Sequence, residues 1–268
     1  MERTWEDVVK SFNTCPYLFI GSGLTRRYLG LPDWSGLLEH FCSRLSGDEF
    51  AYAALKQQGE NDFGKMGDIL ESRFNERWFV DKKFRTDSEL VSDFVKNGVS
   101  PFKAEIAEYI NSFVDPVGSF LEEIKVLREI CNKNISGIIT TNYDSFLENN
   151  VAPDYKIYVG QEELIFSSIQ SIGEIFKIHG SVTKPDSIIL TRKDYLRFDR
   201  KCAYLAAKLM TVFVEYPIIF MGYSISDDNI RKILAAIVEG LSSSQIAQLT
   251  DRFVFIRWVP ELGNEIRI

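Results

Sequence analysis

Several short apolar runs of the chain each end at a glycine or a polar turn, and this pattern limits the folds that the chain can adopt. Such runs occupy residues 17–20, 137–140, 155–159, 175–178, 188–190, 217–221 and 253–256. Segments with apolar residues at helical spacing lie between many of them. Alternating strands and helices favour a parallel sheet that is covered on both faces. We therefore expect an α/β, Rossmann-like fold with a parallel sheet and helices on both faces.

The stretch between residues 48 and 133 interrupts this alternation. It contains a stripe of apolar residues at helical spacing, formed by Phe63, Met66, Leu70, Phe74 and Trp78. Pro101 suits the first position of a further helix. Because no strand pattern is found, we interpret residues 48–133 as an α-helical insertion within one domain that spans residues 1–268.

Turn residues predict where other helices begin. Asp33 or Ser35 can cap the helix that follows them, and Ser226 can cap a later one. A further helix is expected over about residues 201–215. The charged tail after the last apolar run is compatible with the chain being the N-terminal part of a longer protein.

The charge balance narrows the classes of partner. The 38 acidic residues outnumber the 31 basic ones, which gives a net charge of −7. Duplex nucleic acid and anionic membranes are bound through basic surfaces, so we expect neither as a direct partner. No apolar run approaches the roughly 20 residues of a membrane span, and no signal peptide is recognised. We therefore expect cytoplasmic residence. The four cysteines are widely separated, which argues against a bound metal.

The first apolar run ends at Gly21-Ser22-Gly23. Glycine lets the backbone approach a pyrophosphate, and free amides there can bind it. A dinucleotide fingerprint would place a third glycine at position 26, where Arg26 stands. An ordinary strand-to-helix turn therefore remains an alternative for this segment.

Two later strand ends carry side chains that suit chemistry. Asn142 offers a donor and an acceptor, and Asp144 can accept from backbone amides or a hydroxyl. Helix capping is the alternative role for both residues. His179 follows a strand and precedes a glycine, whereas His40 lies within a predicted helix. His179 is therefore the better candidate for a general base.

A fourth polar turn, Gly222-Tyr223-Ser224, follows the run at 217–221. Such a turn can hold a ribose or a phosphate, although a plain loop is the alternative. The carboxyl ends of parallel strands meet at one edge of the sheet. We therefore expect all four segments to converge on one site.

Taken together, these segments resemble the sirtuin family in their order along the chain. Residues 21–25 and 30–34 are similar to the family's glycine turn and its Gly-Ile-Pro-Asp-Phe-Arg loop. Residues 141–144 are similar to its Gln-Asn-x-Asp segment. His179-Gly180 is similar to the family's catalytic histidine and the glycine that follows it. Residues 222–224 are similar to its Gly-Thr-Ser turn.

Departures from the sirtuin deacylases point to a subgroup. The four zinc cysteines of the deacylases are missing, and Ser35 stands in place of the loop arginine. Residues 189–195 and 220–229 resemble the bacterial sirtuin-like effectors of antiphage defence. That resemblance implies hydrolysis of NAD, the substrate, without a metal, and depletion of NAD in abortive infection. It also implies a homo-oligomer with a C-terminal sensor domain or a partner protein that detects phage. The alternatives are a non-catalytic module that binds NAD or ADP-ribose, and a zinc-free deacylase or ADP-ribosyltransferase.

The resemblance also implies a role for each segment. Asn142 would orient a water molecule or the ribose hydroxyls, and His179 would act as general base. Asp144 would hold the loop or contact the ribose. The glycine turn would hold the pyrophosphate, Asp33 and Trp34 the nicotinamide end, and residues 222–224 the adenosine ribose. The expected NAD-binding residues are Gly21, Ser22, Gly23, Leu24, Thr25, Asp33, Trp34, Thr141, Asp144, Gly222, Tyr223 and Ser224.

Overall fold

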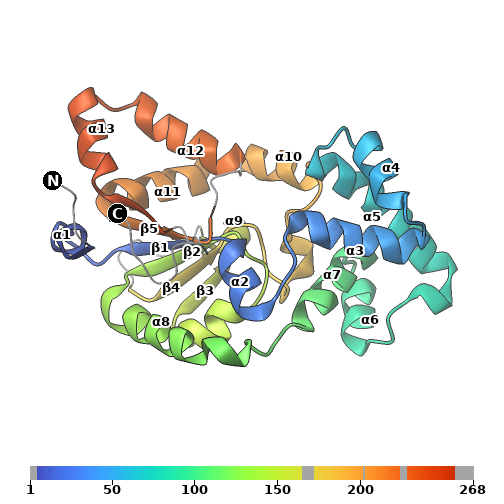
Figure 1. Ribbon diagram of the computed structural model, residues 1–268. Helices are drawn as coiled ribbons and strands as arrows, with labels where there is room; N and C mark the ends of the chain where they lie inside the picture. Colours follow the sequence, from blue (N-terminus) through green and yellow to red (C-terminus); the bar gives the residue numbers. More distant parts are fainter. Residues whose placement is uncertain (1–4, 165–171, 202, 224–227, 257–268) are drawn as a thin grey trace.

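The computed structural model describes residues 5–164, 172–201, 203–223 and 228–256, and its centre is a six-stranded parallel sheet (Figure 1). The strand order is β3-β4-β2-β1-β5-β6. The strands are β1 (Tyr17–Ile20), β2 (Gly137–Thr140), β3 (Lys156–Val159), β4 (Glu174–Lys177), β5 (Ile218–Met221) and β6 (Phe253–Ile256). The predicted α/β fold with a parallel sheet is confirmed.

The register of the sheet aligns the ends of its four inner strands. Ile20 of β1 pairs with Thr140 of β2 and with Met221 of β5, and Thr140 pairs in turn with Lys177 of β4. The residues that follow these positions therefore leave the sheet at one edge. This brings the four segments singled out in the sequence to a common rim.

Helices cover both faces of the sheet. The helices outside the 48–133 stretch are α1 (Trp5–Lys10), α2 (Ser22–Leu29), α3 (Trp34–Ser46), α9 (Gly160–Leu164), α10 (Arg192–Lys201), α11 (Ala203–Glu215), α12 (Asp228–Glu239) and α13 (Ser243–Thr250). Figure 1 shows α11 to α13 above the sheet and α8 (Leu121–Asn134) below it. Tyr17 and Phe19 share one buried cluster with Phe213 of α11, whereas Leu18 shares the other cluster with Leu127 of α8. Alternate side chains of β1 therefore pack into the clusters on the two faces of the sheet, which join the sheet to the helices on both sides.

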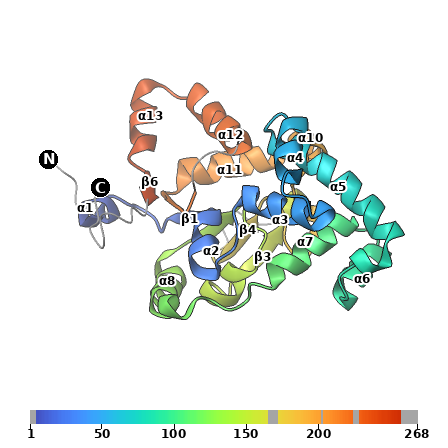
Figure 2. The same cartoon turned by 45° about the vertical axis from the view of Figure 1, so that its right-hand side comes forward.

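The stretch from 48 to 133 is helical with intervening turns and loops, and all of its residues are described. Its helices are α4 (Ala51–Gln58), α5 (Phe63–Val80), α6 (Glu89–Lys96), α7 (Pro101–Asn111) and most of α8. With α3, the helices α4 to α7 gather to one side of the sheet in both ribbon views (Figures 1 and 2). α8 packs under the sheet instead. That the stretch is an insertion stays a prediction.

Several predicted details differ from the structure. Residues 188–190 form no strand, because their backbone groups bond to the 179 loop and to side chains rather than to the sheet. The helix expected over about residues 201–215 is confirmed as α11, whereas α10 before it was not predicted. Ser22 and Gly23 belong to the first turn of α2, with Gly21 as the capping residue, rather than to a separate turn.

The predicted caps have mixed outcomes. Asp33, and not Ser35, caps α3, and its Oδ1 accepts a hydrogen bond from the Gly36 amide at 2.8 Å. Pro101 occupies the first turn of α7, as predicted. The predicted cap Ser226 lies outside the described residues. Among the described helices, none has the length and apolar character that a membrane crossing requires.

Candidate active site

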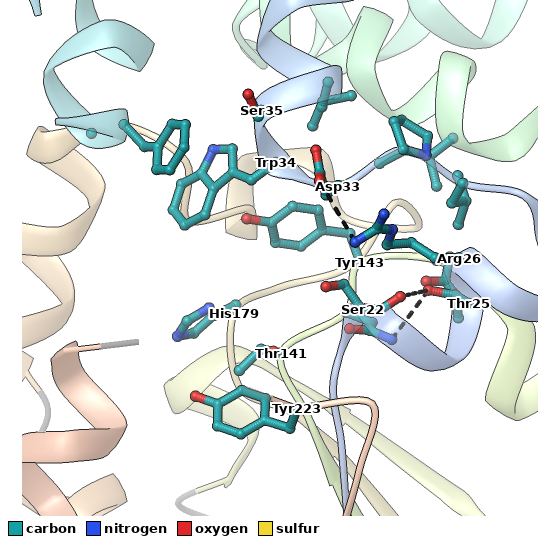
Figure 3. A pocket seen from close by; sticks show the side chains of 18 of the residues that line it. Ser22, Thr25, Arg26, Asp33, Trp34, Ser35, Thr141, Tyr143, His179 and Tyr223 are labelled. Atoms are coloured by element: carbon teal, nitrogen blue, oxygen red, sulfur yellow. Dashed lines mark hydrogen bonds and ion pairs between the residues drawn. The ribbon is translucent and has the colours of Figure 1, made fainter. Parts of the chain in front are cut away.

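A cavity of about 890 Å³ opens at the rim where the inner strands end. Figure 3 shows side chains that line it, contributed by the loops after β1, β2, β4 and β5 and by the helices to one side of the sheet. Ten of the residues predicted as site residues line this cavity: Ser22, Thr25, Asp33, Trp34, Thr141, Asn142, Asp144, His179, Gly222 and Tyr223. The cavity therefore brings together all four segments.

Gly21, Gly23 and Leu24 do not line the cavity, and Ser224 lies outside the described residues. The two glycines instead let the β1–α2 turn pack against Gly222. A Cβ on Gly21 would lie 2.5 Å from the Gly222 oxygen, and one on Gly23 would lie 2.8 Å from it. The Gly23 amide donates to that same oxygen at 2.9 Å. The glycines thus shape the floor of the site by close packing, and the Gly23 amide is already engaged.

Asn142 is held by hydrogen bonds that orient its amide. Its backbone N–H donates to Thr140 Oγ1 at 3.0 Å, and its Nδ2 donates to the Gly21 oxygen at 3.1 Å. Because a carbonyl oxygen can only accept, the amide nitrogen must face Gly21. The opposite atom, Oδ1, is buried and has no hydrogen-bond partner among the described residues. A buried acceptor at a cavity wall suits a hydroxyl group or a water molecule that enters the site.

Asp144 is buried and caps the turn that follows it. Its Oδ1 accepts from the Phe146 amide at 3.0 Å. Burial raises the pKa of this carboxyl above its usual range, although the nearby Lys177 ammonium acts in the opposite direction. Asp144 therefore closes a turn rather than capping a helix, because Phe146 is the capping residue of the helix Leu147–Val151, and Asp144 also lines the cavity.

Lys177 lies below the Asn142 loop, at the end of β4. Its side chain is fully buried, and its Nζ donates to the Asp144 carbonyl oxygen at 2.5 Å. The same ammonium lies 2.6 Å from Glu148 Oε1. Lys177 therefore ties the loop of Asn142 to the strand that leads to His179.

His179 is buried against aromatic rings of α10. Its ring meets Phe198 edge to face at a centroid distance of 5.6 Å, and Tyr195 at 6.1 Å. Figure 3 shows the imidazole at the cavity near Thr141 and Tyr223. Gly180 has a φ of +96°, and a Cβ there would lie 2.3 Å from the Ser187 oxygen. The His-Gly pair therefore requires its glycine for both conformation and space.

An aromatic wall closes the side of the cavity opposite the sheet. The Trp34 indole stacks between Phe63 and Tyr195, with centroid distances of 5.7 and 5.8 Å. Trp34 Nε1 is buried and has no partner within the described part of the chain. Arg26 also lines the cavity, and its guanidinium lies 3.6 Å from Asp33 Oδ2. Aromatic faces, an indole donor and a guanidinium suit a ligand with a planar ring and negative charge.

Several lining residues were missed in the sequence. Phe63 comes from α5, and its approach to Trp34 depends on tertiary packing that no local pattern predicts. Tyr195 lies in the stretch 189–195, whose likeness to defence effectors was the available signal. Lys232 of α12 and Arg192 of α10 also line the cavity. Among the described residues no three His, Cys, Asp or Glu side chains gather as metal ligands, and a site without metal stays a prediction.

Comparison with known proteins gives consistent matches. Residues 136–266 match the family model of the SIR2-like domain. The chain is 25% identical over 162 residues to an NAD(+) hydrolase ThsA of Enterococcus faecium, which covers 59% of this chain and 33% of that protein. It is 27% identical over 111 residues to Defense-associated sirtuin 2 of Bacillus subtilis, covering 40% of this chain and 11% of that protein.

A longer alignment is found with an NAD(+) hydrolase ThsA of Cytobacillus dafuensis. The two are 24% identical over 226 residues, which covers 82% of this chain and 37% of that protein. The chain therefore spans little more than a third, or less, of the length of these curated relatives. The matched region includes β2, β4 and β5, whose ends carry three of the four cavity loops.

Proposed function

We propose that this chain, which carries a SIR2-like domain, hydrolyses NAD at the bond between nicotinamide and ribose. The products are nicotinamide and ADP-ribose. Relatives named NAD(+) hydrolase support this reaction. The observation that carries the proposal is the buried, unpartnered Asn142 Oδ1 at the wall of the cavity, among the described residues.

Asn142 is assigned the task of orienting the nucleophile. Loss of the cationic nicotinamide leaves a ribosyl transition state with oxocarbenium character, so water must approach the opposite face of the sugar. Asn142 Oδ1 accepts a hydrogen bond from that water or from a ribose hydroxyl. The bonds of Nδ2 to Gly21 and of the backbone to Thr140 hold this acceptor in place. Positioning of this kind lowers the entropic part of the barrier.

His179 is assigned the role of general base towards the water or the ribose hydroxyl. Proton transfer to a positioned imidazole contributes roughly 10²–10⁴-fold to a rate. The edge-to-face contacts with Phe198 and Tyr195 fix the plane of its ring. Asp144 holds the Asn142 loop through its bond to the Phe146 amide.

The remaining lining residues are assigned to binding NAD. Ser22 and Thr25 lie at the first turn of α2, where a helix terminus favours the pyrophosphate. Asp33 and Trp34 take the nicotinamide end, where the indole offers a stacking face. Gly222 and Tyr223 take the adenosine ribose, and Thr141 lies between the two ends.

The biological setting is proposed from the relatives. One carries a name that associates it with defence. We infer that NAD loss serves antiphage defence by abortive infection. Assembly into a homo-oligomer, a sensor domain or partner that detects phage, and cytoplasmic residence stay predictions.

The test is NAD turnover by the full chain, both purified and expressed in a bacterial cell. We expect nicotinamide release in step with NAD loss, and a loss of activity in Asn142→Ala and in His179→Ala. Arg128→Ala serves as a control, because Arg128 lies on α8 and does not line the cavity. Saturable NAD binding without any product in either setting would overturn the proposal in favour of a non-catalytic binding module. NAD loss that requires an acyl-lysine peptide or an acceptor protein would overturn it in favour of a transferase.

A further inference from the structure

Lys103 of α7 reaches from the helices beside the sheet to the back of the cavity wall. Its side chain is only 7% exposed, and Nζ donates to the Ile188 carbonyl oxygen and to Asp194 Oδ1, each at 2.7 Å. Lys103 does not itself line the cavity. The Lys103 ammonium therefore holds residues 188–194, which lead into α10, rather than a bound ligand.

Asp194 uses its other oxygen to fix the start of α10. Oδ2 accepts from the amides of Leu190 and Thr191 at 3.2 and 3.0 Å. The Asp194 amide donates in return to Thr191 Oγ1 at 3.2 Å. This reciprocal arrangement is a capping box. The capping box fixes the orientation of α10 relative to the preceding residues 188–190. It thereby fixes the position of Tyr195 in the aromatic wall.

The segment that Lys103 and Asp194 hold also bonds to both catalytic loops. The Ile189 amide donates to the His179 carbonyl oxygen at 3.0 Å. The Ile189 carbonyl oxygen accepts from the Tyr143 hydroxyl at 2.6 Å, and Tyr143 is the neighbour of Asn142 in the chain. One residue of this segment therefore lies between the two loops and bonds to each.

We propose that the Lys103–Asp194 ion pair is a positioning device that sets the placement of Asn142 relative to His179 and couples it to α7. A buried ion pair adds little net stability over an apolar pair of similar size, because both charges lose their water. Its particular contribution is directional, since five hydrogen bonds, two of them from Lys103, fix the segment from 188 to 194. A shift of α7 is thereby transmitted to the catalytic loops. The catalytic consequence rests on the proposed NAD hydrolysis, whereas the structural coupling does not.

Glu105 offers a matched control on the same helix. It is 1% exposed and lies two residues after Lys103. Its carboxylate accepts from Arg44 and from Trp78 Nε1, each at 2.9 Å, and from the Thr86 amide at 3.0 Å. Arg44 belongs to α3 and Trp78 to α5, Thr86 lies in the loop before α6, and none of the three lines the cavity. Loss of this carboxylate disturbs a buried hydrogen-bond network of α7 without affecting the bonds of residues 188–194.

The first test compares amide hydrogen exchange in the full chain without NAD. We expect Lys103→Met to exchange faster in peptides covering residues 141–146 and 187–195. Glu105→Gln should exchange faster only around its own partners, near Arg44 and over residues 78–86. Unchanged exchange at 141–146 and 187–195 in a folded Lys103→Met protein would overturn the coupling. If Lys103→Met does not fold, Thr191→Val takes its place, because it removes only the capping hydroxyl and must loosen the same two peptides.

The second test separates positioning from simple destabilisation. We expect Lys103→Met to lower kcat for NAD by about tenfold or more, with KM changed by less than about threefold, since misplacement of reacting groups acts on the chemical step. Glu105→Gln should leave kcat and KM unchanged. A rise in KM alone, or an equal loss of kcat in Glu105→Gln, would overturn the positioning role. If the wild type releases no nicotinamide, the proposed function fails, while the exchange experiment still decides the coupling.

Discussion

At the scale of single residues, the site depends on side chains whose hydrogen bonds leave one atom available. Asn142 illustrates this, because Nδ2 is used by Gly21 and Thr25 while Oδ1 has no partner among the described residues. The bonds made by the nitrogen fix the orientation of the amide, and the residue that carries this oxygen lines the cavity. Asn142 is thus both a structural link between β1 and β2 and the proposed ligand contact.

The substitution Asn142→Asp tests this orientation. It places a carboxylate oxygen where Nδ2 now donates to the Gly21 carbonyl oxygen, so two acceptors face each other. We expect the free energy of unfolding to fall by about 1–3 kcal/mol and NAD turnover to be lost. Urea denaturation and nicotinamide release measure these effects. Asn142→Ala removes the amide without adding an opposing oxygen, and it should be the more stable of the two variants. An aspartate variant as stable as the wild type would contradict the assigned orientation.

The raised pKa of Asp144 predicts a pH-dependent effect of Asp144→Asn. The asparagine can still accept from the Phe146 amide but carries no buried charge. Because the folded-state pKa lies above the unfolded value of 3.8, the ionised aspartate lowers stability at neutral pH. This loss disappears as the pH falls through the folded pKa towards the unfolded one. We therefore expect the variant to be more stable than the wild type at neutral pH, with a gain that shrinks towards pH 3.8 in denaturant titrations. A gain that does not depend on pH would contradict this account.

Gly180 and Gly98 form a matched pair for testing the turn after His179. Both have a positive φ, but a Cβ on Gly98 would meet no atom within 4 Å, whereas one on Gly180 would overlap the Ser187 backbone. We expect Gly180→Ala to lower the free energy of unfolding by about 1–3 kcal/mol more than Gly98→Ala, because only Gly180 adds a steric clash to the conformational cost. Urea denaturation measures both. Equal losses would show that the backbone conformation alone explains the glycine.

At the scale of elements, the buried pair between Lys177 of β4 and Glu148 joins the strand that leads to His179 to the helix Leu147–Val151, which follows the loop of Asn142. Lys177→Met leaves the Glu148 carboxylate buried without its ammonium partner. We expect the free energy of unfolding to fall by about 3–5 kcal/mol. The double variant Lys177→Met with Glu148→Gln removes the orphaned charge and should regain a large part of this loss in the same denaturation experiment. A double variant as unstable as the single one would contradict the role of charge burial.

The elements also show how far the sequence predicts the fold. The strands were predicted because each contains a short apolar run close to a turn. The four inner strands are buried, whereas the edge strands β3 and β6 are partly exposed. α10 was missed because its sequence is strongly charged and its apolar residues, such as Phe198, are few. Residues 188–190 were wrongly predicted as a strand because they are apolar and two of them are fully buried, although their backbone bonds to Lys103, Asp194 and His179. Burial alone therefore does not distinguish a strand from an anchored loop.

At the scale of the whole molecule, the sequence predicts the rim of the site better than its far wall. Asn142 and His179 follow strands, and parallel strands align their ends, so local pattern and sheet geometry suffice to bring them to one cavity. The far wall depends on helices that are distant in sequence. Phe63 reaches Trp34, and Lys103 reaches Asp194, only through the packing of α5 and α7 beside the sheet. Such long-range approaches carry no local signature.

The central claim is that the full chain uses water to cleave the nicotinamide–ribose bond of NAD. The most direct measurement incubates it with NAD in water labelled with heavy oxygen and analyses the products by mass spectrometry. We predict equal amounts of nicotinamide and ADP-ribose, with one heavy oxygen on the ribose carbon that carried nicotinamide. ADP-ribose attached to protein, or nicotinamide release without the label in ADP-ribose, would contradict the claim.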